Sequence, residues 1–238
     1  MNEIKRAVIM AAGLGNRMKP VSDKTPKPLI EVNGKRMIDT IVDALHENGI
    51  YEIYVVVGYK KEQFYKWAEG KTGITVIDNN LYDTCNNISS LYAAREHIEE
   101  AIILDGDQII YNPSILKKEF TKSGYSCAWT DEETDEWLLT LNMDNKVVSC
   151  SRTGGKKGWQ LFSISRWTKD DGIKLKSFLE EEFEKNNNRQ IYWDDVAMFC
   201  HPESFDLTVY PITKNDIVEI DNFSELCEID NSYKNYID

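Results

Sequence analysis

The sequence predicts an α/β fold built on a parallel sheet, with a second, β-rich region added to it. Through the first half, short apolar runs alternate with amphipathic helical patterns, as a parallel sheet with crossover helices requires. After about residue 125 the pattern changes to closely spaced strand signals. The 238 residues are enough to bury a full core within one domain. We therefore expect one domain over residues 1–238.

The first half supplies the elements of the parallel sheet. Apolar runs predict strands over residues 5–10, 51–59, 73–78 and 101–107, and the last run ends in acidic residues. An amphipathic helix is expected over residues 37–48, because its apolar side chains recur on one face: Met37, Ile38, Ile41, Val42 and Leu45. Two further helices are expected over residues 61–70 and 88–100. Strands and helices thus alternate in the order of a parallel sheet.

The second half is richer in strands. We expect strands over residues 126–130, 137–143, 146–150 and 159–165, followed by a long charged helix over residues 170–188. The tail predicts two short strands, residues 207–212 and 217–221, and a final helix over residues 223–230. No internal repeat or Pro/Gly/Ser linker marks a domain boundary.

Composition limits the classes of partner. The net charge of −12 disfavours a nucleic-acid or membrane partner, although a local basic pocket for one small phosphate remains compatible with it. The five cysteines show no CxxC spacing and the three histidines lie apart from them, so we expect no zinc site and a reduced, cytoplasmic protein. The opening apolar run is too short for a signal peptide, and no uncharged run reaches about 18 residues.

The loop after the first strand, MAAGLGNRMKPVSDKTPKPL over residues 10–29, carries the strongest signal. A dinucleotide-binding interpretation lacks the third glycine and the acidic end of the second strand, and a Walker loop lacks its GK[ST]. What remains is a glycine turn with free backbone N–H groups and two cations, Arg17 and Lys27, which suits a triphosphate. The alternative is a tight turn with solvated basic residues.

Acidic residues at two strand ends predict a metal site. Asp107 ends the strand of residues 101–107, where a carboxylate either holds a hard cation such as Mg²⁺ or caps the next helix. Glu219 and Asp221 alternate on one face of a short strand and are expected to converge on the same ion.

The pattern AAGxGxRxxPxSxxxPKPL, with Ser22 where threonine is common, together with the acidic motif near residue 107, resembles the sugar-phosphate-type nucleotidyltransferases. Three further segments, NNISSLY, TDEWLL and IYWDD, are most similar to the small bacterial CTP:phosphocholine cytidylyltransferases. The resemblance covers nearly the whole chain. It implies a Rossmann-like, mixed and mostly parallel sheet flanked by helices, in which residues 125–200 contribute a small β-rich lid that binds the acceptor.

The resemblance also implies a reaction, namely Mg²⁺-assisted in-line transfer of CMP from CTP to phosphocholine, giving CDP-choline and pyrophosphate. Arg17 would neutralise the leaving pyrophosphate and Lys27 the attacking and α-phosphate oxygens, while Asp107 with Glu219 or Asp221 would hold Mg²⁺. The remaining nucleotide contacts are expected from five residues, of which the last two would read the cytosine edge or simply cap the following helix: Ala12, Gly13, Gly15, Asn87 and Ser90.

A quaternary ammonium has no N–H group and donates no hydrogen bond, so it requires aromatic faces and nearby carboxylates. The candidates are Trp137, Tyr192, Trp193, Asp194, Glu136 and Asp131. The alternatives are that the rings belong to the core and that residues 131–135 are a solvated acidic turn. 2-Aminoethylphosphonate or phosphoethanolamine would suit the same acidic, aromatic pocket. A non-enzymatic or redox dinucleotide-binding module is disfavoured, because Lys27 and Asp107 would then have no role.

Overall fold

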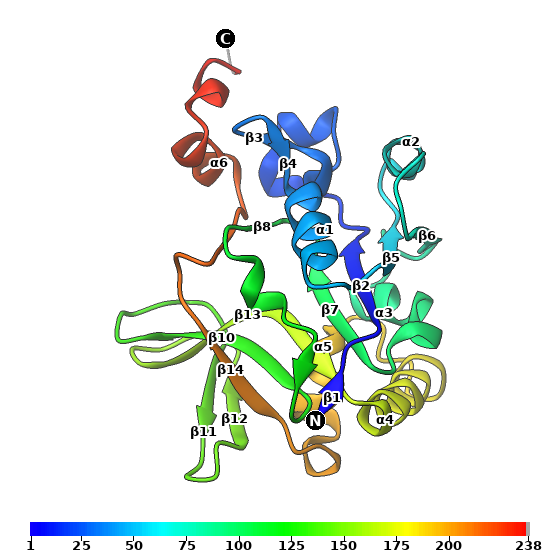
Figure 1. Cartoon of the computed structure of the whole chain (residues 1–238), viewed down its shortest axis with the longest axis vertical. Coiled ribbons are helices and arrows are strands. Elements are labelled where there is room, and N and C mark those ends of the chain that lie inside the picture. The colour runs from blue at the N-terminus through cyan, green and yellow to red at the C-terminus, as the bar shows by residue number, and fades with distance from the viewer. Residues whose placement is uncertain (237–238) are drawn as a thin grey trace.

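A computed structural model describes residues 1–236 and has the predicted α/β architecture (Figure 1). Four strands form the parallel centre of a nine-stranded sheet, in the spatial order β7, β2, β5, β6. They span Ala101–Asp105 (β7), Arg6–Ala11 (β2), Glu52–Val57 (β5) and Ile74–Asp78 (β6). The predicted fold class is therefore confirmed, and the carboxyl ends of these strands meet at one edge.

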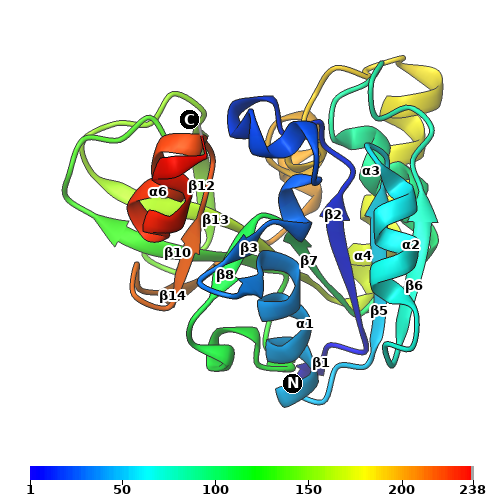
Figure 2. The same ribbon diagram turned by 90° about the horizontal axis from the view of Figure 1, so that it is seen from above.

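Both faces of the parallel centre are covered by helices, which explains its continuous apolar runs. Ala7 and Ile9 of β2 pack in one core cluster with α1 (Met37–Glu47) and α2 (Lys61–Ala68). Val8 and Met10 point the other way, into a second cluster with α3 (Ile88–Ala93) and α4 (Lys169–Glu180). Figure 2 shows this layering from above. The sheet is thus buried on two sides.

The helices follow the predictions except at two ends. The five apolar residues predicted on one face of α1 are all buried. The helix expected over residues 88–100 ends at Ala93 and gives way to a 3₁₀ turn, where the Arg95 guanidinium donates to the Tyr92 carbonyl at 2.8 Å. The charged helix α4 continues beyond Glu180 as a π-helical turn. Within residues 1–236, no helix is both long and apolar enough to span a bilayer.

A single long strand, β13 (Gly158–Trp167), carries the sheet from the parallel centre into the β-rich region. Its last residues pair antiparallel with β7, and its first residues pair with β11 (Leu138–Leu141). Its other edge pairs with β10 (Gly124–Thr130). The remaining strands are β12 (Val147–Ser151) beside β11 and β14 (Thr208–Ile212) beside β10. The β-rich region is therefore an extension of the same sheet.

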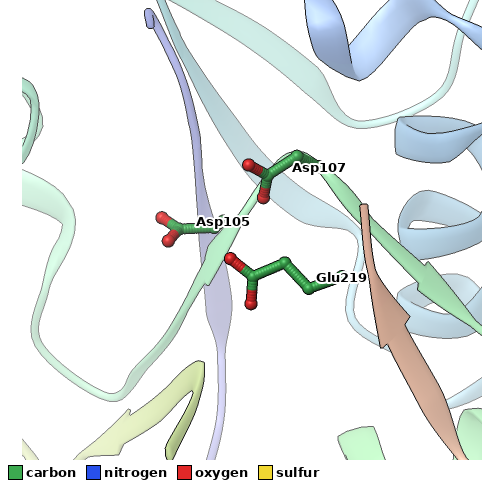
Figure 3. Close-up of side chains that lie close together, drawn as sticks. All are labelled: Asp105, Asp107 and Glu219. Atoms are coloured by element: carbon green, nitrogen blue, oxygen red, sulfur yellow. The ribbon is translucent and has the colours of Figure 1, made fainter. Parts of the chain in front are cut away.

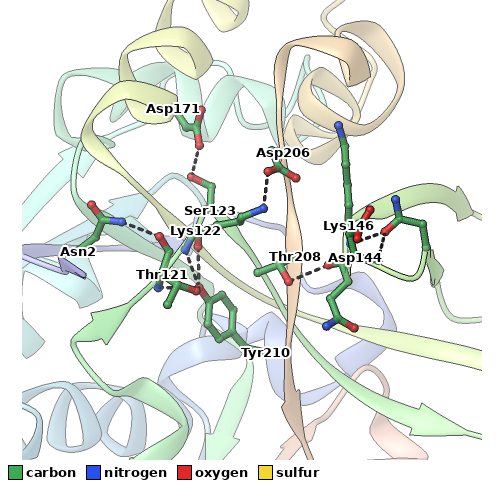
Figure 4. A network of polar contacts seen from close by, with 12 residues as sticks. Asn2, Thr121, Lys122, Ser123, Asp144, Lys146, Asp171, Asp206, Thr208 and Tyr210 are labelled. Carbon is green, nitrogen blue, oxygen red and sulfur yellow. Dashed lines mark hydrogen bonds and ion pairs between the residues drawn. The ribbon is translucent and has the colours of Figure 1, made fainter.

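Polar contacts fix the base of this extension (Figure 4). The Tyr210 hydroxyl of β14 donates to the Lys122 carbonyl at 2.6 Å, and the Ser123 hydroxyl donates to Asp171 of α4 at 2.6 Å. The Thr208 hydroxyl donates to the Asn145 carbonyl at 2.9 Å, in the hairpin between β11 and β12. These bonds join β14, α4 and the hairpin, so the β-rich region is held at several points.

The shortest elements escaped prediction. They are β1 (Asn2–Glu3) with β9 (Glu119–Phe120), the hairpin β3 (Glu31–Val32) and β4 (Lys35–Arg36), and the three-residue elements β8 (Gln108–Ile110) and α5 (Trp193–Asp195). The predicted tail strand is β15 (Ile217–Glu219), and the final helix is α6 (Phe223–Ile229). The antiparallel pair β15 and β8 brings the C-terminal acids beside the end of β7.

Candidate active site

The loop after β2 folds back on itself through a series of 3₁₀ turns. Gly15 has the left-handed φ of 63°, and an added Cβ there would lie 3.3 Å from the Lys27 Cβ and 3.4 Å from the Ser22 Cβ. Glycine is therefore required by the loop's own packing. At Gly13, by contrast, an added Cβ would meet no protein atom within 4 Å. The backbone at Gly13 thus borders open space, as a ligand contact requires.

This loop lines a cavity of about 320 Å³ at the carboxyl ends of the central strands. The cavity contains every residue that the sequence assigned to nucleotide binding: Ala12, Gly13, Gly15, Arg17, Lys27, Asn87 and Ser90. Asp105, Asp107 and Asp221 also line it. The predicted cations and backbone groups therefore lie in one cavity beside the acidic strand ends.

Lys27 is a buried cation held by two carboxylates. Its Nζ lies 2.5 Å from Asp107 Oδ2 and 3.2 Å from Asp221 Oδ1, with 10% of its side chain exposed. Burial lowers the pKa of the ammonium, but the attraction of Asp107 and Asp221 outweighs burial and raises the pKa above its usual value. Arg17 reaches the same Asp221 Oδ1 at 2.8 Å while 70% of its side chain is exposed. Lys27 is thus fixed, and Arg17 faces the cavity opening.

Three carboxylates converge beside this lysine (Figure 3). Asp105 ends β7, Asp107 follows the tight turn at Gly106, and Glu219 ends β15, and their ligand oxygens lie within 4.8 Å of one another. Asp107 Oδ1 is buried and has no hydrogen-bond partner in residues 1–236. Hard carboxylate oxygens with a free lone pair fit Mg²⁺. Asp221, the other predicted ligand, is not one of these three, and its Oδ1 pairs with Lys27 and Arg17, as Asp107 Oδ2 pairs with Lys27.

Burial and mutual repulsion disfavour the ionised form of these carboxyl groups. Burial, and then repulsion from Asp107, raise the pKa of Asp105 to about 7. Burial also raises the pKa of Glu219 well above its usual value, and Asp107 and Asp105 raise it further. A divalent cation would relieve this repulsion. The cluster therefore has the properties of a cation site at which protons compete.

The two residues predicted to read the base are each held by a hydrogen bond, and neither side chain caps the next helix. Asn87 Oδ1 accepts a hydrogen bond from the Trp193 backbone N–H at 2.9 Å, and it makes no capping bond to α3. The buried Ser90 Oγ accepts from Asn79 Nδ2 at 3.0 Å. The Ser90 hydroxyl hydrogen is thereby left to donate elsewhere. Both side chains are oriented and line the cavity.

A second cavity, of about 330 Å³, adjoins the first. The two cavities share Arg17, Asn87, Asp105, Asp107 and Asp221. The second is otherwise lined mainly from the β-rich region and α5, by Asp135, Glu136, Trp137, Arg152, Leu161, Ser163, Tyr192, Asp194 and Glu219. Two small molecules, one in each cavity, would therefore meet beside the carboxylate cluster.

Four of the six predicted acceptor-binding residues line this second cavity. The rings of Trp137 and Tyr192 touch edge to face, with centroids 5.5 Å apart. Burial, and then Asp221, raise the pKa of Glu136. Burial, and then Asp105, raise the pKa of Asp194, whose side chain is almost fully buried. Two aromatic rings and two carboxyl groups are thus available to a cationic ligand.

The structure places the other two predicted residues elsewhere. Trp193 is 2% exposed and packs in the core between Tyr125 and Trp167, at centroid distances of 6.3 and 6.2 Å. Asp131 is exposed and pairs with Lys157 at 3.7 Å, outside the cavity. In the segment IYWDD, neighbouring side chains point in different directions, so Tyr192 and Asp194 face the cavity while Trp193 faces inward.

Several residues at the site were not predicted, among them Asp105, Asn79 and Arg152. Asp105 was overlooked although it stands in the same LDGD segment as Asp107. Asn79, which orients Ser90, follows a predicted strand and could have been noticed there. Arg152 has no signal in the sequence, because only the pairing of β11 with β12 brings the end of β12 to the cavity.

Comparisons with known proteins agree with this geometry. The family described as "MobA-like NTP transferase domain" matches residues 7–160. A 2-aminoethylphosphonate cytidylyltransferase of Lancefieldella rimae is 35% identical over 97% of this chain and 94% of that protein. A choline-phosphate cytidylyltransferase of Streptococcus pneumoniae is 31% identical over 97% of this chain and 99% of that protein. A solved structure of CTP:phosphocholine cytidylyltransferase from Streptococcus pneumoniae superposes with a TM-score of 0.88, covering 95% of this chain and 98% of that one.

Proposed function

The chain belongs to the MobA-like NTP transferase domain family, and we propose that it transfers CMP from CTP to phosphocholine, giving CDP-choline and pyrophosphate. The family resemblance predicted from the loop of residues 10–29 is confirmed, and the chain is an enzyme of the cytidylyltransferase group. The choice of phosphocholine as acceptor is our proposal.

One observation carries the proposal: the second cavity combines two aromatic rings with carboxyl groups and opens onto the carboxylate cluster. A quaternary ammonium binds to ring faces, here Trp137 and Tyr192, and is balanced by acids such as Glu136 and Asp194. The phosphate of the same molecule would then extend toward Lys27 and Arg17. We accordingly assign the acceptor-binding lid to the strands and α5 within the predicted range of residues 125–200, whereas α4 in that range covers the parallel centre.

The proposed reaction is a direct displacement at the α-phosphorus of CTP. An oxygen of the acceptor phosphate forms a bond to the α-phosphorus while the bond from that phosphorus to the bridging oxygen of pyrophosphate breaks. Lys27, fixed by Asp107 and Asp221, would neutralise the negative charge that develops on the attacking and α-phosphate oxygens. Arg17, at the cavity opening, neutralises the departing pyrophosphate. Positioning and charge neutralisation are sufficient, and no covalent enzyme intermediate is needed.

The proposed cofactor is Mg²⁺, which Asp107 and Glu219 would hold with Asp105 as a third ligand. When bound, it would supply Lewis-acid neutralisation of the phosphate oxygens. Asp221 is then a partner of Lys27 and Arg17 in our assignment. Ala12, Gly13 and Gly15 would contact the nucleotide through the backbone, and Asn87 and Ser90 would contact the base.

2-Aminoethylphosphonate is the second candidate acceptor, because the Lancefieldella rimae relative named for that substrate is 35% identical over nearly the whole chain. A buried primary ammonium needs hydrogen-bond acceptors. Asp194 Oδ1 is buried without a partner in residues 1–236 and would provide one. The two acceptors therefore depend on different groups of the same cavity.

The test is product analysis with CTP, Mg²⁺ and phosphocholine, phosphoethanolamine or 2-aminoethylphosphonate in separate reactions. We expect CDP-choline and pyrophosphate in equal amounts, with phosphocholine giving the highest kcat/KM and with no product when the metal is chelated. A higher kcat/KM for either primary amine would overturn the choice of acceptor. An absence of CMP transfer to all three would overturn the proposed substrate class.

A further inference from the structure

We infer that Arg152 is a positioning residue for the acceptor, because it joins the two separate segments that carry the aromatic rings of the second cavity. The inference rests on the proposed transfer of CMP to a phosphorylated amine. Trp137 directly precedes β11, whereas Tyr192 directly precedes α5, far away in the sequence. The ring pair therefore depends on a contact that holds these segments together.

The first half of this contact is an ion pair at the end of β12. An Arg152 guanidinium nitrogen lies 2.6 Å from Asp195 Oδ1. Only 2% of the Asp195 side chain is exposed. Arg152 lines the cavity, and 45% of its side chain is exposed. Asp195 Oδ2 accepts the backbone N–H of Tyr192 at 2.9 Å. The Asp195 side chain thus links the Arg152 guanidinium to the backbone of Tyr192.

The second half is aromatic. The guanidinium carbon of Arg152 lies 3.9 Å from the centroid of the Phe199 ring and 5.7 Å from that of Trp137. Trp137 and Phe199 also touch edge to face, with centroids 5.9 Å apart at 88°. One guanidinium therefore contacts Trp137 from one segment, and Phe199 and Asp195 from the other.

The energetic balance favours retention of this contact. A carboxylate as buried as Asp195 is costly without a cation, and removal of one partner from a buried pair destabilises the other. The planar guanidinium stacks on a ring and bonds to a carboxylate at the same time, which a lysine ammonium does less well. Loss of Arg152 should therefore loosen the rings without touching the loop of residues 10–29.

A competing interpretation predicts the opposite sign. Arg152 is itself a cation on the ring wall, so it could repel the acceptor's ammonium and compete with it for the face of Trp137. Removal of a competitor would lower the acceptor KM, whereas removal of a positioning residue raises it. The direction of the change in KM thus separates the two.

The experiment measures KM and kcat for CTP, phosphocholine and 2-aminoethylphosphonate in Arg152→Met and Arg152→Lys. Methionine keeps an apolar stem but loses the charge. We expect Arg152→Met to raise the KM of the preferred acceptor about tenfold, with the KM for CTP and the kcat at saturation within about twofold of wild type. Arg152→Lys should recover part of the loss, because it keeps the charge opposite Asp195. An acceptor KM that is unchanged or lower in Arg152→Met would overturn the inference.

Lys157→Met is the matched control. Lys157 also lies over a tryptophan of the β-rich region, 5.5 Å from the Trp129 centroid, and pairs with an aspartate, but it does not line the second cavity. Lys157→Met should leave the KM values for CTP, phosphocholine and 2-aminoethylphosphonate unchanged. Melting temperatures of all variants show whether a change in KM comes from general unfolding.

A mutant cycle tests whether Arg152 acts through the rings. If it positions Trp137 and Tyr192, Arg152→Met should change the acceptor kcat/KM by less than about twofold in a background that already carries Trp137→Leu and Tyr192→Leu. A full, additive loss in that background would show that Arg152 contacts the acceptor directly and would overturn the positioning role. Since both acceptors are measured, wild-type preference for 2-aminoethylphosphonate would contradict the proposed acceptor but would still allow the test of Arg152.

Discussion

The two cavities are built in different ways. The first takes its cations and backbone contacts from one continuous loop, residues 10–29, and completes them with groups at neighbouring strand ends. The second gathers Glu136, Trp137, Arg152, Tyr192 and Asp194 from three segments that only the β-rich sheet and α5 bring together. The first is therefore fixed by local sequence, whereas the second depends on long-range packing. We expect substitutions in the first to affect chemistry and those in the second to affect acceptor choice.

The largest effect is expected where the two cavities meet. Asp107→Asn removes a carboxylate from the cluster and from the pair with Lys27, so kcat should fall by about 10³-fold or more, measured by pyrophosphate release. The matched control is Asp23→Asn, which changes an exposed carboxylate of the same loop. If Asp107→Asn turns over as fast as the control, Asp107 takes no part in the chemical step.

The next effect tests the loop itself. Lys27→Ala should lower kcat by about 10²-fold at saturating CTP and acceptor, because a preorganised cation is lost where negative charge develops. Arg17→Ala should act mainly on the KM for CTP, since Arg17 is exposed at the cavity opening. Lys24→Ala, a cation of the same loop outside the first cavity, is the control. A wild-type kcat/KM for CTP in both variants would show that the loop is a structural turn that does not bind the triphosphate.

On the acceptor side, Trp137→Leu or Tyr192→Leu should raise the KM for phosphocholine about tenfold or more and leave the KM for CTP nearly unchanged. A cation–π contact with a desolvated ammonium is worth about 2 kcal/mol. Trp129→Leu changes an exposed tryptophan of the same β-rich region outside the second cavity and should have no effect. A parallel rise in both KM values would mean that the two cavities are not independent.

The pH dependence of metal binding tests the carboxylate cluster of Asp105, Asp107 and Glu219, which lies where the two cavities meet. Asp105 has a pKa of about 7 in the fold, above its unfolded value, so without metal its contribution to stability is present at low pH and lost as pH rises through 7. Metal binding requires the ionised form. The apparent Mg²⁺ affinity, measured by calorimetry, should therefore fall about tenfold from pH 8 to pH 6. Asp105→Asn should weaken this dependence and leave the part that comes from Glu219, whose pKa is also raised. A dependence unchanged in that variant would assign the titration to another group.

The smallest effect concerns the base. Ser90→Ala removes one oriented hydroxyl, so the KM for CTP should rise about threefold to tenfold, as expected for one hydrogen bond of about 1 kcal/mol. The acceptor KM should not change. Ser89→Ala is a demanding control, because Ser89 is a neighbouring buried serine that also bonds to Asn79 but does not line the first cavity. Equal effects of the two substitutions would indicate a packing defect shared by the helix.

The contrast between the cavities also explains what the sequence could predict. The spacing of Gly13, Gly15, Arg17 and Lys27 within one loop is a local property, so their meeting in one cavity could be predicted. The parallel strands and their helices were predictable for the same reason, since their periodicity is local. The meeting of Asp107 with Glu219 was also predicted, although it depends on the separate antiparallel pair of β15 and β8, which sets Glu219 opposite Gln108, the residue after Asp107.

The rest depends on tertiary contacts. The sequence alone could not show that Trp193 turns into the core, because that follows from its packing against Tyr125 and Trp167. Nor could it show that Arg152 reaches the second cavity, since that depends on the antiparallel register of β11 and β12. The position of Asp131 in an acidic segment near Trp137 predicts contact with the acceptor, but the exposed Asp131 side chain pairs with Lys157.

The most direct measurement is an internal competition between acceptors. The wild-type enzyme is given CTP, Mg²⁺ and equal concentrations of phosphocholine and 2-aminoethylphosphonate, and the two products are quantified by mass spectrometry at low conversion. Their ratio equals the ratio of the two kcat/KM values. An acceptor site built on Trp137 and Tyr192 predicts that CDP-choline predominates by about tenfold or more. Predominance of CMP-2-aminoethylphosphonate would contradict this assignment of the second cavity.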